Sequence, residues 1–138
     1  MPAPTEPPIT VYGWELHLTG PSTTQRGSDK YYRVLIIGNT TLVNYGRRES
    51  SGQFIAHRFP TGDGAKAKAR ELTNEKSSKG YVVTRDMTDF EVPAARVRFT
   101  TKLPLGPSKP SGVDGAWLVD RFKTAAAEQG TVENGASR

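Results

Sequence analysis

An aromatic residue followed closely by two arginines is the part of this sequence best suited to binding chemistry. Tyr45 is followed by Gly46, Arg47 and Arg48. A tyrosine ring can stack on an exposed sugar or base, guanidinium groups pair with phosphates, and glycine lets the backbone come close to a ligand. We therefore expect a nucleic-acid-binding segment here. The alternative is a hairpin end that carries a half-buried tyrosine and solvated arginines.

Further cations lie on both sides of this segment and are candidates for the same site. They are Lys30, Arg33, Lys66, Lys68, Arg70 and Lys79, with Lys76 between the last two. Binding to a polyanion without base specificity needs only clustered cations. If the helix that carries the later lysines lies beside Arg47 and Arg48, the cations form a phosphate track. Otherwise Lys66, Lys68, Arg70, Lys76 and Lys79 are a solvated helix face.

Catalytic and metal-binding residues are sparse. His17 and His57 are the only histidines, and neither has carboxylates nearby at a spacing typical of metal ligands. Ser50 or Ser51 with His57 and Asp63 would supply the residue types of a catalytic triad, but no nucleophile elbow surrounds the serines. We expect no metal, no cofactor and no enzymatic activity.

The positive charge is concentrated in the middle of the chain. The 138 residues carry a formal net charge of +5, and the segments 1–28, 29–81 and 82–138 contribute −1, +5 and +1. Such a central excess is expected when one face of one domain binds a polyanion. Cysteine is absent, the beginning does not look like a signal peptide, and no apolar run is long enough for a membrane helix. These features favour a cytoplasmic protein.

Alternating apolar residues predict a small antiparallel sheet. Strands are expected over residues 9–18, 30–37, 41–45, 53–59 and 81–84, with residues 30–45 forming a hairpin. An amphipathic helix is expected over residues 64–77, capped by Asp63, with Ala65, Ala69 and Leu72 on its buried face. The fold class is therefore α+β, a small antiparallel β-sheet with one packed helix.

The ends of the chain are expected to lie outside this domain. Residues 1–8 are predicted to be a disordered lead, residues 9–84 the domain, residues 85–129 an extension and residues 130–138 a disordered tail. In the extension we expect a strand at 95–103, with Arg96 and Arg98 on a basic face, and a helix at 113–129. Trp14 and Trp117 are interpreted as core aromatics, although the Trp117 helix is also a candidate for docking on another copy of this chain or on another protein.

Several short strings occur in an order that resembles one family, the WGR domain of poly(ADP-ribose) polymerases and bacterial proteins. The matching strings are Asp29-Lys30-Tyr31-Tyr32-Arg33-Val34, Tyr45-Gly46-Arg47 in place of Trp-Gly-Arg, Gly52-Gln53, Arg58-Phe59, the Ala- and Lys-rich helix, and Lys76-Ser77-Ser78-Lys79-Gly80-Tyr81. Together they cover residues 29–81. The tyrosine and the loop from Arg48 to Gly52 depart from the family pattern.

This resemblance implies a nucleic-acid-associated module. It leads us to expect a non-enzymatic protein that grips the sugar–phosphate backbone of DNA with little base specificity, at ends, nicks or single strands. The alternative is an adaptor that binds an acidic protein partner through the same edge or the C-terminal helix. A protein of the bacterial cytoplasm or nucleoid, encoded by a bacterium or a phage, fits the resemblance.

Overall fold

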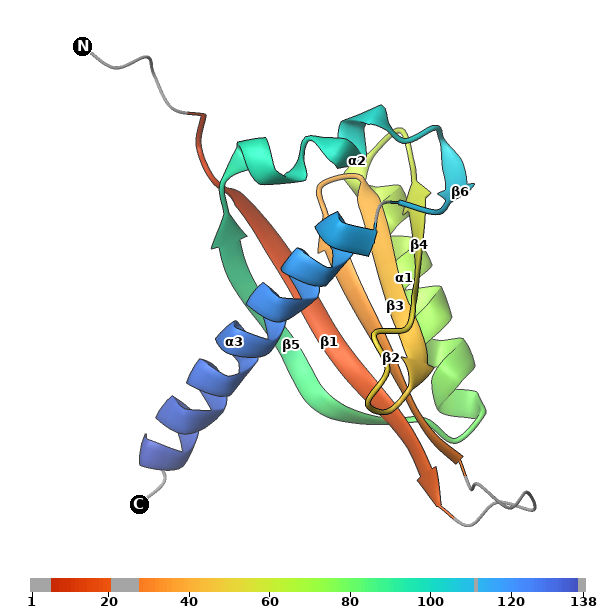
Figure 1. Cartoon of the computed structure of the whole chain (residues 1–138), viewed down its shortest axis with the longest axis vertical. Coiled ribbons are helices and arrows are strands. Elements are labelled where there is room, and N and C mark those ends of the chain that lie inside the picture. Colours follow the sequence, from red (N-terminus) through yellow and green to blue (C-terminus); the bar gives the residue numbers. More distant parts are fainter. Residues whose placement is uncertain (1–5, 21–27, 111, 137–138) are drawn as a thin grey trace.

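Six antiparallel strands form one sheet, in the order β5-β1-β2-β3-β4-β6 (Figure 1). The computed structural model describes residues 6–20, 28–110 and 112–136. Its elements are β1 (Ile9–Gly20), β2 (Ser28–Ile37), β3 (Thr40–Arg47), β4 (Gln53–Arg58), α1 (Gly62–Ser78), β5 (Val82–Val92), the 3₁₀ helix η1 (Ala94–Val97), α2 (Phe99–Lys102), β6 (Gly106–Ser108) and α3 (Gly112–Ala136). The expected α+β class and the antiparallel sheet are confirmed.

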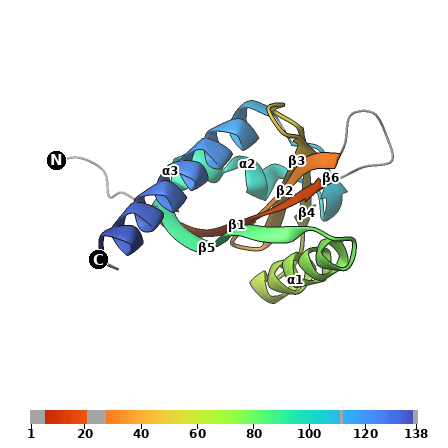
Figure 2. The same ribbon diagram turned by 90° about the horizontal axis from the view of Figure 1, so that it is seen from below.

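Helices cover both faces of the sheet, because β2 is apolar on both sides. Tyr32, Val34 and Ile36 lie in the core beneath α1, whereas Leu35 and Ile37 lie in a separate core beneath α3. Side chains alternate between the two faces of a strand, so a continuous apolar run requires a cover on each face. Figure 2 shows α1 and α3 on opposite sides of the sheet.

Helix α1 matches the predicted amphipathic helix, but its N-cap differs. Ala65 and Ala69 are fully buried against the sheet, and Leu72 packs beside them. The cap is Thr61, whose Oγ1 accepts a hydrogen bond from the Gly64 amide at 3.4 Å. Asp63 lies in the first turn instead, where a carboxylate stabilises the helix dipole.

The predicted strand at 95–103 is wrong, since the chain forms η1 and α2 there. Val97 and Thr100 are buried at a spacing of three residues. That spacing fits a tight helical turn, whereas strand alternation would put the two side chains on opposite faces. The hydrogen bond from the Arg96 amide to the Pro93 carbonyl at 2.9 Å starts the turn.

Strand β5 is much longer than expected and lies at the edge of the sheet. It pairs with β1 from Ile9 opposite Val92 to His17 opposite Val82. Only every second residue of an edge strand needs to be apolar, and here Thr88, Phe90 and Val92 face the α3 core while acidic residues separate them. The intervening charges concealed the strand in the sequence.

Helix α3 crosses the sheet diagonally over β1 and β5 (Figure 1). Phe122 is fully buried, and Trp117 packs against the same core, which confirms its reading as a core aromatic. The helix continues to Ala136, past the expected end near Gln129. Residues 1–5 and 137–138 of the predicted disordered ends lie outside the described residues. None of the described helices is long and apolar enough to cross a membrane.

Candidate nucleic-acid interface

The register of the β2–β3 hairpin brings cations and aromatic rings to one end of the sheet. Lys30 is the cross-strand partner of Arg47, and Tyr32 is the partner of Tyr45. Tyr32 and Tyr45 belong to the α1 face. Because residues two positions apart share a face of a strand, Lys30 and Arg47 lie on this face too. Both cations are exposed.

Three tyrosines pack together beside this pair. The ring centroid of Tyr32 lies 6.3 Å from that of Tyr45 and 6.2 Å from that of Tyr81. Lys76, near the end of α1, places its Nζ 5.0 Å from the Tyr32 ring centroid and 5.8 Å from that of Tyr81. We call Lys30, Tyr45, Arg47 and Lys76 the hairpin-end cluster.

The buried tyrosines of this region keep their protons. Burial raises the pKa of Tyr32 well above its ordinary value, and the nearby carboxylate of Glu75 raises it further. Burial also raises the pKa of Tyr81. The rings beneath the cluster therefore add no negative charge that would repel a polyanion.

The loop that follows Arg47 is held in one shape by hydrogen bonds. The Tyr31 hydroxyl donates to the Ser50 carbonyl at 2.8 Å, and Asn44 Nδ2 donates to the Ser51 carbonyl at 3.0 Å. Gly52 has φ of 72°, and a Cβ there would lie 2.2 Å from the Tyr31 hydroxyl. Glycine is thus required at position 52 for conformation and for space.

Arg48 is separated from Tyr45 by the sheet itself. Its guanidinium lies 3.7 Å from the Asp29 carboxylate. Arg48 also lines a cleft on the face of the sheet that α3 partly covers. Tyr45 lies on the α1 face. The structure therefore brings Arg47, but not Arg48, to the face that presents the Tyr45 ring.

Arg33 is buried rather than available to phosphates. Its Nε donates to Glu15 Oε2 at 2.6 Å, its Nη1 donates to Asn44 Oδ1 at 2.6 Å, and its guanidinium carbon lies 4.0 Å from the Tyr31 ring centroid. These contacts use the guanidinium inside the protein. The sequence signal was present, because a charge inside an apolar strand run is typical of a buried ion pair.

A polar cleft of about 460 Å³ surrounds this ion pair on the α3 side. The other oxygen of Glu15 accepts a hydrogen bond from Arg85 Nε at 2.8 Å, and His17 Nε2 lies 3.8 Å from Glu15. Lys123 of α3 lines the same cleft. Sequence reasoning missed Arg85 and Lys123, since they come from a strand and a helix outside the segment 29–81.

The cations of α1 are divided among different surroundings rather than arranged in one track. Lys68 pairs with Glu71 at 3.5 Å, and Lys79 pairs with Glu75 at 3.7 Å. Lys66 and Arg70 line a groove between α1 and the β1–β5 side of the sheet. Of the α1 cations, only Lys76, near the C-terminal end of the helix, belongs to the hairpin-end cluster.

The WGR family model matches residues 17–88, just over half of the chain, and this protein belongs to the WGR domain family, a family of nucleic-acid-binding modules. Among solved structures, the crystal structure of a Bacteroides fragilis protein, a target of the Northeast Structural Genomics Consortium, is 28% identical over 51% of this chain with a TM-score of 0.43. That match spans only 19% of the Bacteroides protein. A search of curated proteins found no significant match.

Proposed function

We propose that this protein binds DNA without catalysing a reaction, by gripping the sugar–phosphate backbone at the hairpin-end cluster. The observation that carries the proposal is the direct pairing of Lys30 with Arg47 across two strands. Like charges opposite each other destabilise a sheet. A phosphate placed between them would relieve that repulsion, and Tyr45 on the same face offers a ring to the neighbouring sugar or base.

The positions of these cations predict that the protein binds DNA with little base specificity. Lys30 and Arg47 are at strand ends, and Lys76 is near the end of α1, whose other face is packed on the sheet. Reading bases in the major groove requires a protruding helix or ribbon that enters it. Backbone contacts with a stacking ring fit DNA ends, nicks or single strands better than a specific duplex sequence.

The test is fluorescence anisotropy of labelled blunt duplex, nicked duplex and single strand, at two salt concentrations. We expect salt-dependent binding, with a log–log slope of about −0.9 per neutralised phosphate on duplex DNA. The variant Lys30→Glu with Arg47→Glu should bind at least tenfold more weakly and with a shallower slope. Tyr45→Ala should lose about 1–3 kcal/mol, while Tyr45→Phe, which keeps the ring, should bind like the parent protein.

A matched control changes the same amount of charge elsewhere. Lys102 and Lys109 are exposed and lie outside the cluster, at the end of α2 and after β6. Lys102→Glu with Lys109→Glu should leave most of the affinity intact. Equal losses in both double variants would contradict a localised site, and no binding of the parent protein at low salt would overturn DNA binding altogether.

A protein partner is the second candidate, and the edge strand β5 favours it. Val82, Val83 and Met87 are exposed large apolar residues on this strand, and in the described part of the chain its outer side pairs with no other strand. An open edge of this kind can add a strand from a partner. If the parent protein fails to bind DNA at low salt, this edge becomes the surface to test.

A further inference from the structure

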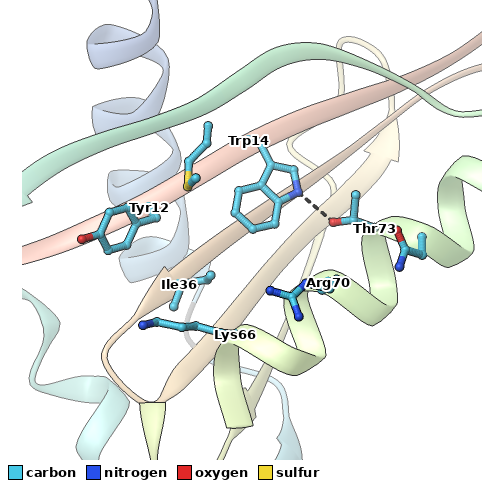
Figure 3. A pocket seen from close by; sticks show the side chains of 8 residues that line it. Tyr12, Trp14, Ile36, Lys66, Arg70 and Thr73 are labelled. Atoms are coloured by element: carbon cyan, nitrogen blue, oxygen red, sulfur yellow. Dashed lines mark hydrogen bonds between the residues drawn. The ribbon is translucent and has the colours of Figure 1, made fainter. Parts of the chain in front are cut away.

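A groove of about 460 Å³ lies between α1 and the β1–β5 side of the sheet, away from the hairpin-end cluster (Figure 3). Its lining residues come from four elements: Tyr12 and Trp14 from β1, Ile36 from β2, Lys66, Arg70, Thr73 and Asn74 from α1, and Met87 from β5. The groove therefore joins an apolar sheet surface to a polar helix flank.

The apolar side of the groove is rich in aromatic surface and is open to solvent. Tyr12 is 38% exposed and Met87 is 62% exposed. In the view of Figure 3 the Trp14 indole lies between Tyr12 and Thr73. The indole Nε1 of Trp14 donates to Thr73 Oγ1 at 2.8 Å. Because this hydrogen bond joins the ring to α1, the indole is held in place before any ligand arrives.

The helix side supplies cations. Lys66 and Arg70 are exposed and lie one helical turn apart, and Figure 3 shows both side chains extending along the groove. The ion pairs found for α1 among the described residues involve Lys68 and Lys79 instead. None of the eight lining residues is acidic. The groove thus combines ring faces with two cations, and the nearest acidic residue by strand register is Asp89, the β5 partner of Tyr12.

We propose that this groove holds an unpaired nucleotide of single-stranded DNA. The base stacks against Trp14 and Tyr12, since a ring face accepts any base. Lys66 and Arg70, one turn apart, meet successive phosphates of the strand, and the amide of Asn74 reaches the base edge that pairing would otherwise hide. An apolar peptide would fill the ring side but leave both cations without partners.

The inference rests on the proposed DNA binding and deepens it. The hairpin-end cluster grips the backbone of an end or a nick, and the groove takes an unpaired base from a single-stranded segment. The two sites use different residues, so substitutions separate them.

Tryptophan fluorescence provides a direct readout of the groove. The chain has two tryptophans, so Trp117→Phe leaves Trp14 as the only one. In this variant, an oligothymidylate should quench the Trp14 emission with the same concentration dependence as binding measured by anisotropy. An abasic oligonucleotide of equal length keeps the phosphates but lacks the bases, and it should cause no quenching. Equal quenching by both oligonucleotides would overturn base stacking in the groove.

Variants of the groove should discriminate between DNA forms. Lys66→Ala with Arg70→Ala should weaken oligothymidylate binding about tenfold or more and leave blunt-duplex binding within about twofold. Tyr12→Ala, at an exposed position, should weaken oligothymidylate binding without affecting the duplex. The control Lys102→Ala with Lys109→Ala removes the same charge outside the groove and should leave both affinities unchanged.

The outcomes distinguish this inference from the proposed function. If the blunt duplex binds through Lys30 and Arg47, but the groove variants bind oligothymidylate like the parent protein, the groove is not a nucleotide site and the proposed function stands. If neither DNA form binds at low salt, both proposals are overturned. Quenching of Trp14 together with selective loss in the groove variants supports the inference.

Discussion

Trp14 and Thr73, which are 59 positions apart in the chain, are joined by a hydrogen bond of 2.8 Å from the indole Nε1 to the threonine Oγ1. The Thr73 hydroxyl in turn donates to the Ala69 carbonyl at 2.8 Å, one turn earlier in α1. These two consecutive hydrogen bonds fix the distance between β1 and α1. They therefore set the width of the groove that we assign to an unpaired base.

Thr73→Val tests these hydrogen bonds, because valine has nearly the same shape as threonine and no hydroxyl. The half-buried indole N–H would lose its acceptor, and we expect the free energy of unfolding to fall by about 1–2 kcal/mol. Thr73→Ser retains the hydroxyl and should lose less than half as much. Urea denaturation measures both, and a larger loss in Thr73→Ser than in Thr73→Val would show that the methyl group, rather than the hydrogen bond, matters.

Glu15→Ala should be the most destabilising of the charge substitutions. Glu15 is 3% exposed and accepts hydrogen bonds from both Arg33 and Arg85. Its removal leaves Arg33 buried without a counter-charge, at a cost of about 3–5 kcal/mol. The comparison is Glu71→Ala, which breaks an exposed pair with Lys68 and should cost below about 1 kcal/mol. Similar urea midpoints for the two variants would contradict a buried ion pair.

His57 should make the stability of the protein depend on pH. Burial lowers the pKa of His57 below its ordinary value of 6.5, and the positive charge of Lys68 lowers it further, while Glu71 opposes the shift. Because the folded-state pKa lies below the unfolded value, the unfolded chain binds more protons in that interval. The contribution of His57 to the free energy of unfolding is therefore fully present above its pKa in the unfolded chain. It is lost as the pH falls through its pKa in the folded protein.

The measurement is the urea midpoint at pH about 7.5 and about 5.5, on either side of the unperturbed histidine pKa. His57→Gln should reduce the loss of stability at the lower pH. Lys68→Ala should raise the His57 pKa in an NMR titration, because it removes the neighbouring cation. A His57 pKa above 6.5 in the folded parent protein would contradict the prediction.

Gly115→Ala should destabilise the docking of α3, although alanine is the better helix former. A Cβ at this position would lie 2.4 Å from Cδ2 of Phe54 on β4. Overpacking costs about 1–3 kcal/mol, which exceeds the gain of about 1 kcal/mol from helix propensity. In a Phe54→Leu background the ring is absent and the penalty should shrink. An unchanged penalty in that background would show that the two residues do not clash.

The sequence determined the elements whose patterns are local. The hairpin of β2 and β3 follows from two β-rich runs around Gly38 and Asn39, and α1 follows from the switch to helical spacing at Ala65 and Ala69. The order of short strings around Tyr45 identified the WGR family, which the family model confirmed. These elements can be predicted from the sequence because they depend on residues that are close together in the chain.

Other features depended on contacts between distant segments. Arg33 looked like a member of a phosphate track, yet Glu15, 18 positions earlier, holds it inside the protein. The length of β5 was hidden, because its exposed acidic residues alternate with the residues that face the α3 core, and only the fold shows that one face of β5 is open to solvent. In the segment 95–103, the alternation of Val97 and Phe99 with arginines fitted a strand, but the chain turns helical there and buries Val97 and Thr100.

The sequence by itself determined which residue types are available: an aromatic ring, a central excess of cations and an apolar frame that forces the hairpin. The tertiary structure decided which of them act together. Strand alternation put Tyr45 and Arg47 on one face, and the turn after β3 carried Arg48 to the cleft on the other. The packing of α1 divided its cations between the hairpin end and the Trp14 groove. The physical reason is that the face and depth of a side chain depend on register and packing across the sheet, which no local pattern records.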